Sequence, residues 1–464
     1  MPRTALVTGA TGFVGSALVP RLLDAGWTVR VLARHPERLD AAWSGRVEVV
    51  TGDAGSASDL AVALKDADVA YYLLHSMDAG GDFAARDRTL ATEFAAAARH
   101  ARLGRIVYLG GLHPDGVPLS PHLASRVEVG EILLGSGVPT AVLQAGVVLG
   151  RDSASFLMLR HLTERLPVAV GPVWLASRIQ PIALRDVLHY LVAAADLPPE
   201  TSRTFDLGMD EVLTYAGMMR RYARVAGLVP RVVGTVPVLT PSLASHWVGL
   251  VTPVPASVAK PLVGSLVHDA VRHESDADAV LGPPPGGTLG FDDAVRDALD
   301  GTDPRLWGRT ARRVGAGVAA TALVGSLFTD PSSRWYARLR KPAWQPPPVA
   351  FPIAWTTLYA LVWAASTATI HESIEGGQRR RADAFAAALA ANLTLNAAWS
   401  GLFFRAHRLR VSTAAAAVLA ASSADLARRA APTGRGKALG LGLYAGWCAF
   451  ATALTAAVAR RNPT

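Results

Sequence analysis

Cysteine and acidic side chains are scarce in this chain of 464 residues. The single cysteine, Cys448, excludes an intrachain disulfide and gives no sign of an oxidising compartment. Acidic residues almost disappear toward the C-terminus, where residues 305–464 hold 20 Lys and Arg but only 5 Asp and Glu. Residues 1–304 hold the other 26 basic and 32 acidic side chains. The front of the chain is therefore acidic and the back strongly basic.

The basic C-terminal part does not favour nucleic acid as a partner, because its cations flank long apolar runs, as they do in membrane loops. Half of the chain is hydrophobic and the mean hydropathy is +0.26, which is high for a soluble enzyme. The N-terminus lacks a signal-peptide pattern, since the sequence TGATG interrupts its short apolar stretch. Any membrane insertion is therefore expected from internal segments.

A glycine-rich turn near the N-terminus predicts a dinucleotide site. Residues 4–8 have a strand pattern, GxxGxxG spacing follows, and SALVPRLLDAG then has a helical pattern. Glycines permit a tight turn and a close approach of the backbone to a pyrophosphate, which faces the helix N-terminus. The residues expected to bind the cofactor here are Gly9, Thr11, Gly12, Phe13, Val14 and Gly15.

Strand and helix patterns alternate beyond this turn, with further strands expected at WTVRVLAR, VEVVTGD, DVAYYLLHS and RIVYLGGL. This alternation is typical of an α/β fold with a Rossmann-like, doubly wound parallel sheet. Arg34 and Arg38 follow the second strand, where NAD sites usually carry an acid. Two cations suit a 2′-phosphate, so NADP(H) is favoured over NAD(H); two solvated surface arginines are the alternative. Asp53, at the end of the third strand, is placed to meet the adenine ring.

These motifs resemble those of the short-chain dehydrogenase/reductase superfamily, and most of all its atypical, NmrA-like NAD(P)H-binding branch. The resemblance covers about residues 3–300 and rests on TGATGFVG, VRVLARHPERL, the Gly52-Asp53 pair, YYLLHSM, YLGGL and QPIALRDVLHYL. In that superfamily a Tyr-x-x-x-Lys pair handles the substrate proton and holds the nicotinamide ribose. The aligned stretch here is HLASR, which puts His122 at the tyrosine position and Arg126 at the lysine position, with Ser125 nearby.

The HLASR stretch leaves the chemistry of this part open. Histidine can act as an acid or base near neutral pH, whereas arginine keeps its charge. One interpretation is catalytic: His122 replaces the tyrosine, assisted by Ser125 and Arg126, in the reduction of a hydrophobic carbonyl-type substrate. The other is that the domain binds the cofactor without turning it over. An exposed loop histidine is the plain alternative for His122, and no metal site is predicted.

Five apolar stretches follow, and each is close to the ~20 residues that span a bilayer. They lie at about 312–329, 350–371, 383–404, 409–427 and 437–459. The sequence therefore predicts an all-α five-helix transmembrane bundle after the α/β part. The expected domains are 1–300 for NAD(P)H binding with a C-terminal substrate region, 301–311 for a linker and 312–462 for the membrane part. Asn392, Asn396 and Trp399 share a helix face that we expect to look into the bundle.

The membrane part resembles the TspO/MBR family of translocator proteins, also called tryptophan-rich sensory proteins. The resemblance covers about residues 310–462 and rests on WYARLRKPAWQPP, F-x-x-x-WTTLY, LNAAWSGLFF and YAGWCAFATAL. Members of that family are five-helix membrane proteins, often dimeric, that bind tetrapyrroles and other flat hydrophobic ligands. The resemblance implies a ligand site formed by Trp335, Trp344, Trp355, Tyr359, Asn396, Trp399, Tyr444 and Trp447. Leu443 and Thr455 stand where the family commonly has proline and asparagine.

Together these patterns predict a membrane-anchored, NADP(H)-binding reductase-like protein whose membrane domain binds a tetrapyrrole or another hydrophobic ligand. The alternatives are a non-catalytic NADPH sensor that regulates ligand binding or transport, and two independent activities in one chain. The expected partners are a hydrophobic small molecule, membrane lipid and a second copy that pairs through the membrane domain. The expected location is the cell membrane, with several spans and the N-terminal domain in the cytoplasm, where the pyridine nucleotide pool lies.

Overall fold

The computed structural model describes residues 3–75, 83–236 and 251–463. The chain divides into two compact units, Met1–Pro304 and Arg305–Thr464. The first helix of the second unit, α12 (Leu306–Phe328), begins inside the segment expected as a linker at 301–311. Ser76 and Met77, which end the YYLLHSM motif, lie outside the described residues.

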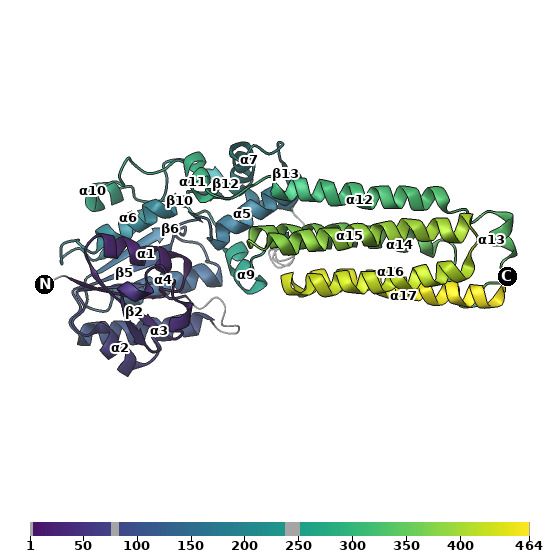
Figure 1. Ribbon diagram of the computed structural model, residues 1–464. Coiled ribbons are helices and arrows are strands. Elements are labelled where there is room, and N and C mark those ends of the chain that lie inside the picture. The colour runs from purple at the N-terminus through teal and green to yellow at the C-terminus, as the bar shows by residue number, and fades with distance from the viewer. Residues whose placement is uncertain (1–2, 76–82, 237–250, 464) are drawn as a thin grey trace. The chain divides into compact units, whose positions relative to one another are not determined.

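A parallel sheet of seven strands forms the centre of the described part of the first unit (Figure 1). Its strands, in spatial order, are β11 (Arg203–Leu207), β6 (Thr140–Ala145), β5 (Arg105–Gly111), β4 (Val69–Tyr72), β1 (Thr4–Thr8), β2 (Thr28–Ala33) and β3 (Glu48–Thr51). The predicted Rossmann-like sheet is confirmed. Because β2 pairs with one side of β1 and β4 with the other, the topology switches at β1, where sheets of this kind bind their ligands.

Helices cover both faces of this sheet, so its strands are buried on both sides and have nearly continuous apolar sequences. Successive residues point to opposite faces: Val7 packs in the core on one side and Leu6 in the core on the other. The face of Val7 is covered by α1 (Phe13–Asp24) and α6 (Leu184–Ala194). The opposite face is covered by α2 (Ala57–Leu64), α3 (Phe83–His100) and α4 (Pro121–Leu134).

A second hydrophobic core lies beside the sheet in the first unit. Phe156, Tyr222 and Phe291 are fully buried in it. They come from α5 (Ala154–Arg165), α7 (Tyr215–Val225) and α11 (Phe291–Ala298). Another helix, α9 (Ala256–Ser265), packs against α4 and α5. The last residue of α9, Ser265, therefore lies close to the first turn of α4.

Long helices build the second unit (Figure 1). Besides α12 they are α14 (Ala350–Glu375), α15 (Arg379–Ser400), α16 (Leu409–Ala430) and α17 (Arg435–Arg461). Of the described helices, three are long and apolar enough to cross a membrane, at 350–375, 379–405 and 435–461. α12 and α16 are less apolar because charged residues, serine and threonine interrupt their apolar sequences. Five membrane crossings therefore remain a prediction.

A chain of hydrogen bonds crosses the interior of this helical unit. The Tyr359 hydroxyl on α14 donates to Asn396 Oδ1 on α15 at 2.9 Å, and Asn396 Nδ2 donates to the Tyr444 hydroxyl on α17 at 2.9 Å. Tyr444 donates in turn to Asn392 Oδ1 at 3.0 Å, and Asn392 Nδ2 donates to Ser423 Oγ on α16 at 3.0 Å. Both asparagines are buried. The prediction that they face into the bundle is confirmed, and they link four helices.

The Tyr444→Phe change should destabilise this unit, because it removes two bonds of the chain and leaves amide groups of Asn392 and Asn396 buried without partners. We expect a loss of about 1–2 kcal/mol, the range for polar contacts between membrane helices. Tyr359→Phe removes only one bond and should cost less. Thermal unfolding of the purified chain in detergent measures both, and equal stability of the wild type and Tyr444→Phe would contradict the assigned bonds.

Candidate functional site

The turn between β1 and α1 requires glycine at two positions. Gly9 has a φ of +71°, and a Cβ there would overlap the carbonyl oxygen of Leu73. A Cβ at Gly15 would overlap the carbonyl oxygen of Gly9. The Gly12 amide donates to that same carbonyl at 2.9 Å, which closes the turn. The GxxGxxG spacing thus reflects close packing of the first helix turn on the end of β1.

This turn leaves main-chain donors for a ligand. α1 begins at Phe13, and no side chain caps its N-terminus. Val14 packs on the sheet core, and Phe13 lies against the backbone of Gly150, so both side chains serve packing and their amides are the groups at the helix end. Thr11 is exposed beside them. An uncapped helix N-terminus at a topological switch point suits a pyrophosphate, which fits the group that the fold implies.

Arg34 and Asp53 lie next to each other at the carboxyl ends of β2 and β3. Arg34 Nη1 is 4.0 Å from Asp53 Oδ2, and the other carboxylate oxygen accepts the Gly55 amide at 2.8 Å. Arg38 is exposed in a 3₁₀ turn, Pro36–Arg38, that follows β2. Both arginines are therefore accessible to a ligand at this edge of the sheet.

His122 is buried at the mouth of an internal pocket and is not an exposed loop histidine. It lies in the first turn of α4, and its ring centroid is 4.9 Å from that of His75. Its Nδ1 is 2.7 Å from Ser265 Oγ at the end of α9. The pocket measures about 190 Å³ and opens at the carboxyl ends of β5 and β6. Its apolar lining includes Leu112, Met158, Ile179, Leu262 and Leu266.

The surroundings of His122 do not favour the ionisation near neutral pH that a catalytic histidine would need. Burial, with added repulsion from Arg126 and His75, lowers the pKa of His122 to about 3. The Ser265 hydroxyl lies 3.1 Å from the Pro261 carbonyl, which can only accept, so Ser265 donates there and accepts from His122 Nδ1. The Nε2 lone pair of a neutral His122 then remains, and that atom has no partner among the described residues.

His75 belongs to a second polar group at the same pocket. Its Nδ1 is 2.9 Å from Asp87 Oδ2, and the Ser125 hydroxyl donates to that oxygen at 3.3 Å. Ser125 is buried and faces Asp87, so it supports the carboxylate. The sequence analysis missed both His75 and Asp87. The position of His75 just after β4, at the carboxyl edge of the sheet, was an available signal, whereas nothing distinguished Asp87 from other helical acids.

Arg126 is held by the main chain of β5. Its guanidinium donates to the Leu109 carbonyl and lies 5.7 Å from the centroid of the Tyr108 ring. The Tyr108 hydroxyl donates in turn to the Arg126 carbonyl at 3.2 Å. Arg126 thus stays at the edge of the pocket, where the resemblance places the lysine of the Tyr-x-x-x-Lys pair.

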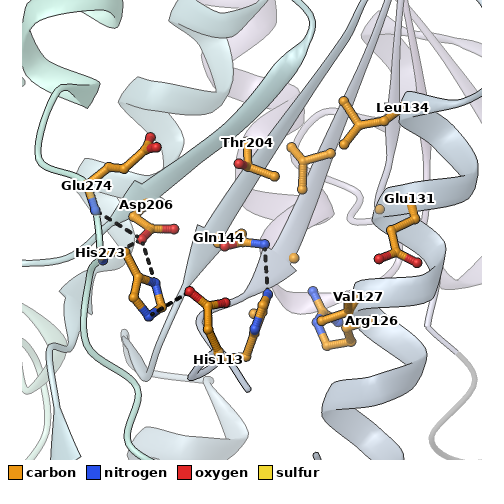
Figure 2. Close-up of a pocket in the computed structure, with 15 residues that line it drawn as sticks. His113, Arg126, Val127, Glu131, Leu134, Gln144, Thr204, Asp206, His273 and Glu274 are labelled. Carbon is orange, nitrogen blue, oxygen red and sulfur yellow. Dashed lines mark hydrogen bonds and ion pairs between the residues drawn. The ribbon is translucent and has the colours of Figure 1, made fainter. Parts of the chain in front are cut away.

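Arg126 also lines a second, more polar pocket of about 290 Å³ between α4 and strands β5, β6 and β11. Figure 2 shows Arg126 and Glu131 on α4 facing side chains that rise from the strands, Asp206 among them. His273 Nδ1 lies 3.4 Å from Asp206 Oδ2, which also accepts the His273 amide at 2.7 Å. No sequence pattern pointed to this pocket, because its residues come from distant segments.

The predicted ligand residues of the second unit fall into two aromatic clusters. In the first, the Trp355 ring lies 5.4 Å from Tyr359, 6.4 Å from Tyr444 and 6.5 Å from Trp447. Asn396 joins this cluster through its bonds to both tyrosines. Trp344 joins it through Phe450, which contacts both Trp344 and Trp447.

Trp335 and Trp399 belong to the other cluster. Both contact Phe403, at 5.6 Å and 5.3 Å between ring centroids, and Trp335 stacks on His407 at 4.0 Å. Phe403 lies in a π-helical turn, Gly401–Arg405, that extends α15. The structure therefore brings six of the eight predicted residues together and packs Trp335 and Trp399 elsewhere.

Known proteins match each unit separately. A family model described as NAD(P)H-binding matches residues 9–134, and the TspO/MBR family model matches residues 314–461. Ceramide reductase of Caulobacter vibrioides is 32% identical over 243 residues, which cover 49% of this chain and 72% of that protein. The translocator protein of Homo sapiens is 35% identical over 150 residues, which cover 30% of this chain and 82% of that protein.

A solved structure supports the fold of the first unit. The NADPH-dependent quinone oxidoreductase QOR2 of Escherichia coli aligns with a TM-score of 0.51 at 18% identity, covering 63% of this chain and 98% of that one. For the first unit, the glycine turn, the topological switch point and these matches all indicate an NAD(P)H-binding domain. For the second unit, the apolar helices agree with the match to the TspO/MBR family. The chain therefore belongs to two families at once, as an NAD(P)H-binding, reductase-like domain of the NmrA-like type fused to a membrane domain of the TspO/MBR family.

Proposed function

We propose that the first unit is an NADPH-dependent reductase of a lipophilic carbonyl compound. The observation that carries this proposal is the pair of histidine rings, 4.9 Å apart, at a pocket whose other walls are largely apolar. The similarity to a ceramide reductase, a protein named for a lipid, supports a substrate of this class. We also place this unit in the cytoplasm, because NADPH is supplied there and the second unit is a membrane domain.

The cofactor end of the site is built for binding. The uncapped amides at the start of α1 suit the pyrophosphate, and Arg34 and Arg38 suit a 2′-phosphate at the ribose. NADPH supplies the hydride when it is bound. The Leu109-anchored guanidinium of Arg126 adds positive charge beside the pocket, where the resemblance places the group that holds the nicotinamide ribose.

The proton for the substrate oxygen is assigned to His75. The Asp87 carboxylate accepts from His75 Nδ1, so it fixes the ring orientation and stabilises positive charge on the imidazole. His122 has another role, because it stays neutral and offers a lone pair at Nε2. That atom can accept a hydrogen bond from a hydroxyl of the substrate or of the alcohol product, and this bond would orient the bound molecule. His75 is therefore the proposed catalytic acid and His122 the proposed binding group.

NADPH oxidation with a panel of long-chain ketones and aldehydes tests this function. Asp87→Asn and His75→Gln should each lower kcat at least a hundredfold, within the range for general acid catalysis, and leave NADPH binding unchanged. Because the pKa of His122 is about 3, no ionisation of His122 should appear in the rate between pH 5 and 8. A rate limb near pH 6.5 that vanishes in His122→Asn would contradict this assignment. If the wild type oxidises NADPH with none of the carbonyl compounds in the panel, a sensor role replaces the enzymatic one.

Arg34→Ala should change cofactor preference. Losing a charged contact to the 2′-phosphate costs about 1.5–3 kcal/mol, so NADPH binding should weaken at least tenfold while NADH binding stays nearly the same. Arg46→Ala, an exposed arginine beyond the site, serves as the matched control. Titration of tryptophan or nicotinamide fluorescence measures both cofactors. An equal loss for NADPH and NADH would refute the preference for NADP(H).

For the second unit we propose a tetrapyrrole or similar flat ligand at the cluster around Trp355 and Trp447. The two rings lie at 88° to each other, and the buried indole nitrogen of Trp447 has no partner among the described residues. Flat aromatic faces held by neighbouring tyrosines can contact a planar macrocycle at modest entropic cost. A buried donor without a protein partner suits a polar group on such a ligand.

Trp355→Phe and Trp447→Phe should each weaken porphyrin binding, by about 0.5–1.5 kcal/mol for each lost ring contact, or roughly two- to tenfold in affinity. Trp399→Phe is the matched control, because its ring packs in the other cluster. Quenching of tryptophan fluorescence by protoporphyrin gives the affinities. A Trp399→Phe variant that loses as much affinity as the other two would place the ligand elsewhere.

A further inference from the structure

Three helices of the second unit border a long groove that the function above does not use. The groove measures about 900 Å³ and is lined by α12, α15 and the end of α14. α12 and α15 run in the same direction along it, since Gly317 contacts Leu393 and Gly325 approaches Ser400. The stretch from Arg309 to Phe328 on α12 spans about 28 Å at 1.5 Å per residue. This length is close to the ~30 Å hydrocarbon thickness of a bilayer.

The two ends of the groove differ in chemistry. Arg309, Arg313 and Arg379 line the end where α12 and α15 begin, against the single carboxylate of Asp383. Arg313 and Arg379 form no ion pair in the described part of the chain. The rest of the lining is mostly alanine, glycine, valine and leucine. The groove is thus amphipathic along its length, with net positive charge at one end.

We propose that this groove holds one acyl chain of an anionic phospholipid, whose phosphate lies at Arg313 and Arg379. An amphiphile matches both the apolar length and the charged end, and anionic headgroups attract basic residues at a membrane surface. A planar macrocycle fits poorly, because Phe328 is the single aromatic side chain among the described lining residues. This site is separate from the aromatic cluster around Trp355.

A second copy of the chain is a weaker fit for the same groove. Two chains inserted in one membrane with the same orientation and paired about a two-fold axis would place the same helix ends side by side. Arg313 and Arg379 would then face the same arginines of the other copy, and like charges repel. A phosphate removes that repulsion, whereas a protein partner of identical sequence increases it.

The chain provides matched controls for a test, because the neighbours Arg312 and Arg380 carry the same charge outside the groove. The full-length protein is released from micelles with equal amounts of phosphatidylglycerol and phosphatidylcholine, and retained lipid is counted by native mass spectrometry. The wild type should retain phosphatidylglycerol preferentially. Arg313→Ala and Arg379→Ala should each lower that retention about fivefold. Arg312→Ala and Arg380→Ala should leave it unchanged.

A second pair of variants separates the apolar groove from its charged end. Ala386 lines the groove and Ala387 does not, so Ala386→Trp should remove both lipids while Ala387→Trp retains them. Equal losses within either matched pair would overturn the proposal. So would an Ala386→Trp variant that keeps its lipid but changes from dimer to monomer, which would identify a second copy as the occupant.

Discussion

The contact between Gly15 and the carbonyl oxygen of Gly9 is the constraint on which the nucleotide site depends. Because neither residue has a side chain at this point, the first turn of α1 packs directly on the end of β1. That approach leaves the helix amides uncapped at the switch between β2 and β4. The sheet order and the turn therefore act together: the order opens a crevice, and the turn places donors at its edge.

At the histidine pocket, burial is the constraint on which the arrangement depends. His122 and His75 are neighbours in space although they come from different elements, and α9 closes over them with Ser265. The same enclosure that suits an apolar substrate lowers the pKa of His122 and removes it from acid–base chemistry near neutral pH. Asp87 stands behind His75 and fixes the orientation of its ring, which is the geometry behind the proposal that His75 is the acid. The two proposed roles therefore rest on the different neighbours of the two rings.

Sequence reasoning predicted the features that depend on local sequence pattern. The strands were predicted from continuous apolar runs such as TALVT, and the glycine spacing located the turn. The faces of Asn392 and Asn396 followed from helical periodicity, because one buried stripe of a helix is visible in its sequence. The sequence pattern could not show which distant elements of the chain meet in space. Asp87 is an ordinary helical acid until α3 brings it to His75, and Trp399 has the same helical spacing as the ligand residues although its ring packs on Phe403.

The hydrogen-bond chain from Tyr359 to Ser423 ties α14, α15, α16 and α17 to one another, and α12 contributes no member to it among the described residues. α12 is instead joined to the bundle by packing and by a hydrogen bond that the Trp363 indole of α14 donates to the Ala311 carbonyl at 2.9 Å. The peptide chain from the first unit enters the bundle through this helix. α12 therefore depends on its packing against α14 and α15, and not on the buried polar chain, for its place in the bundle.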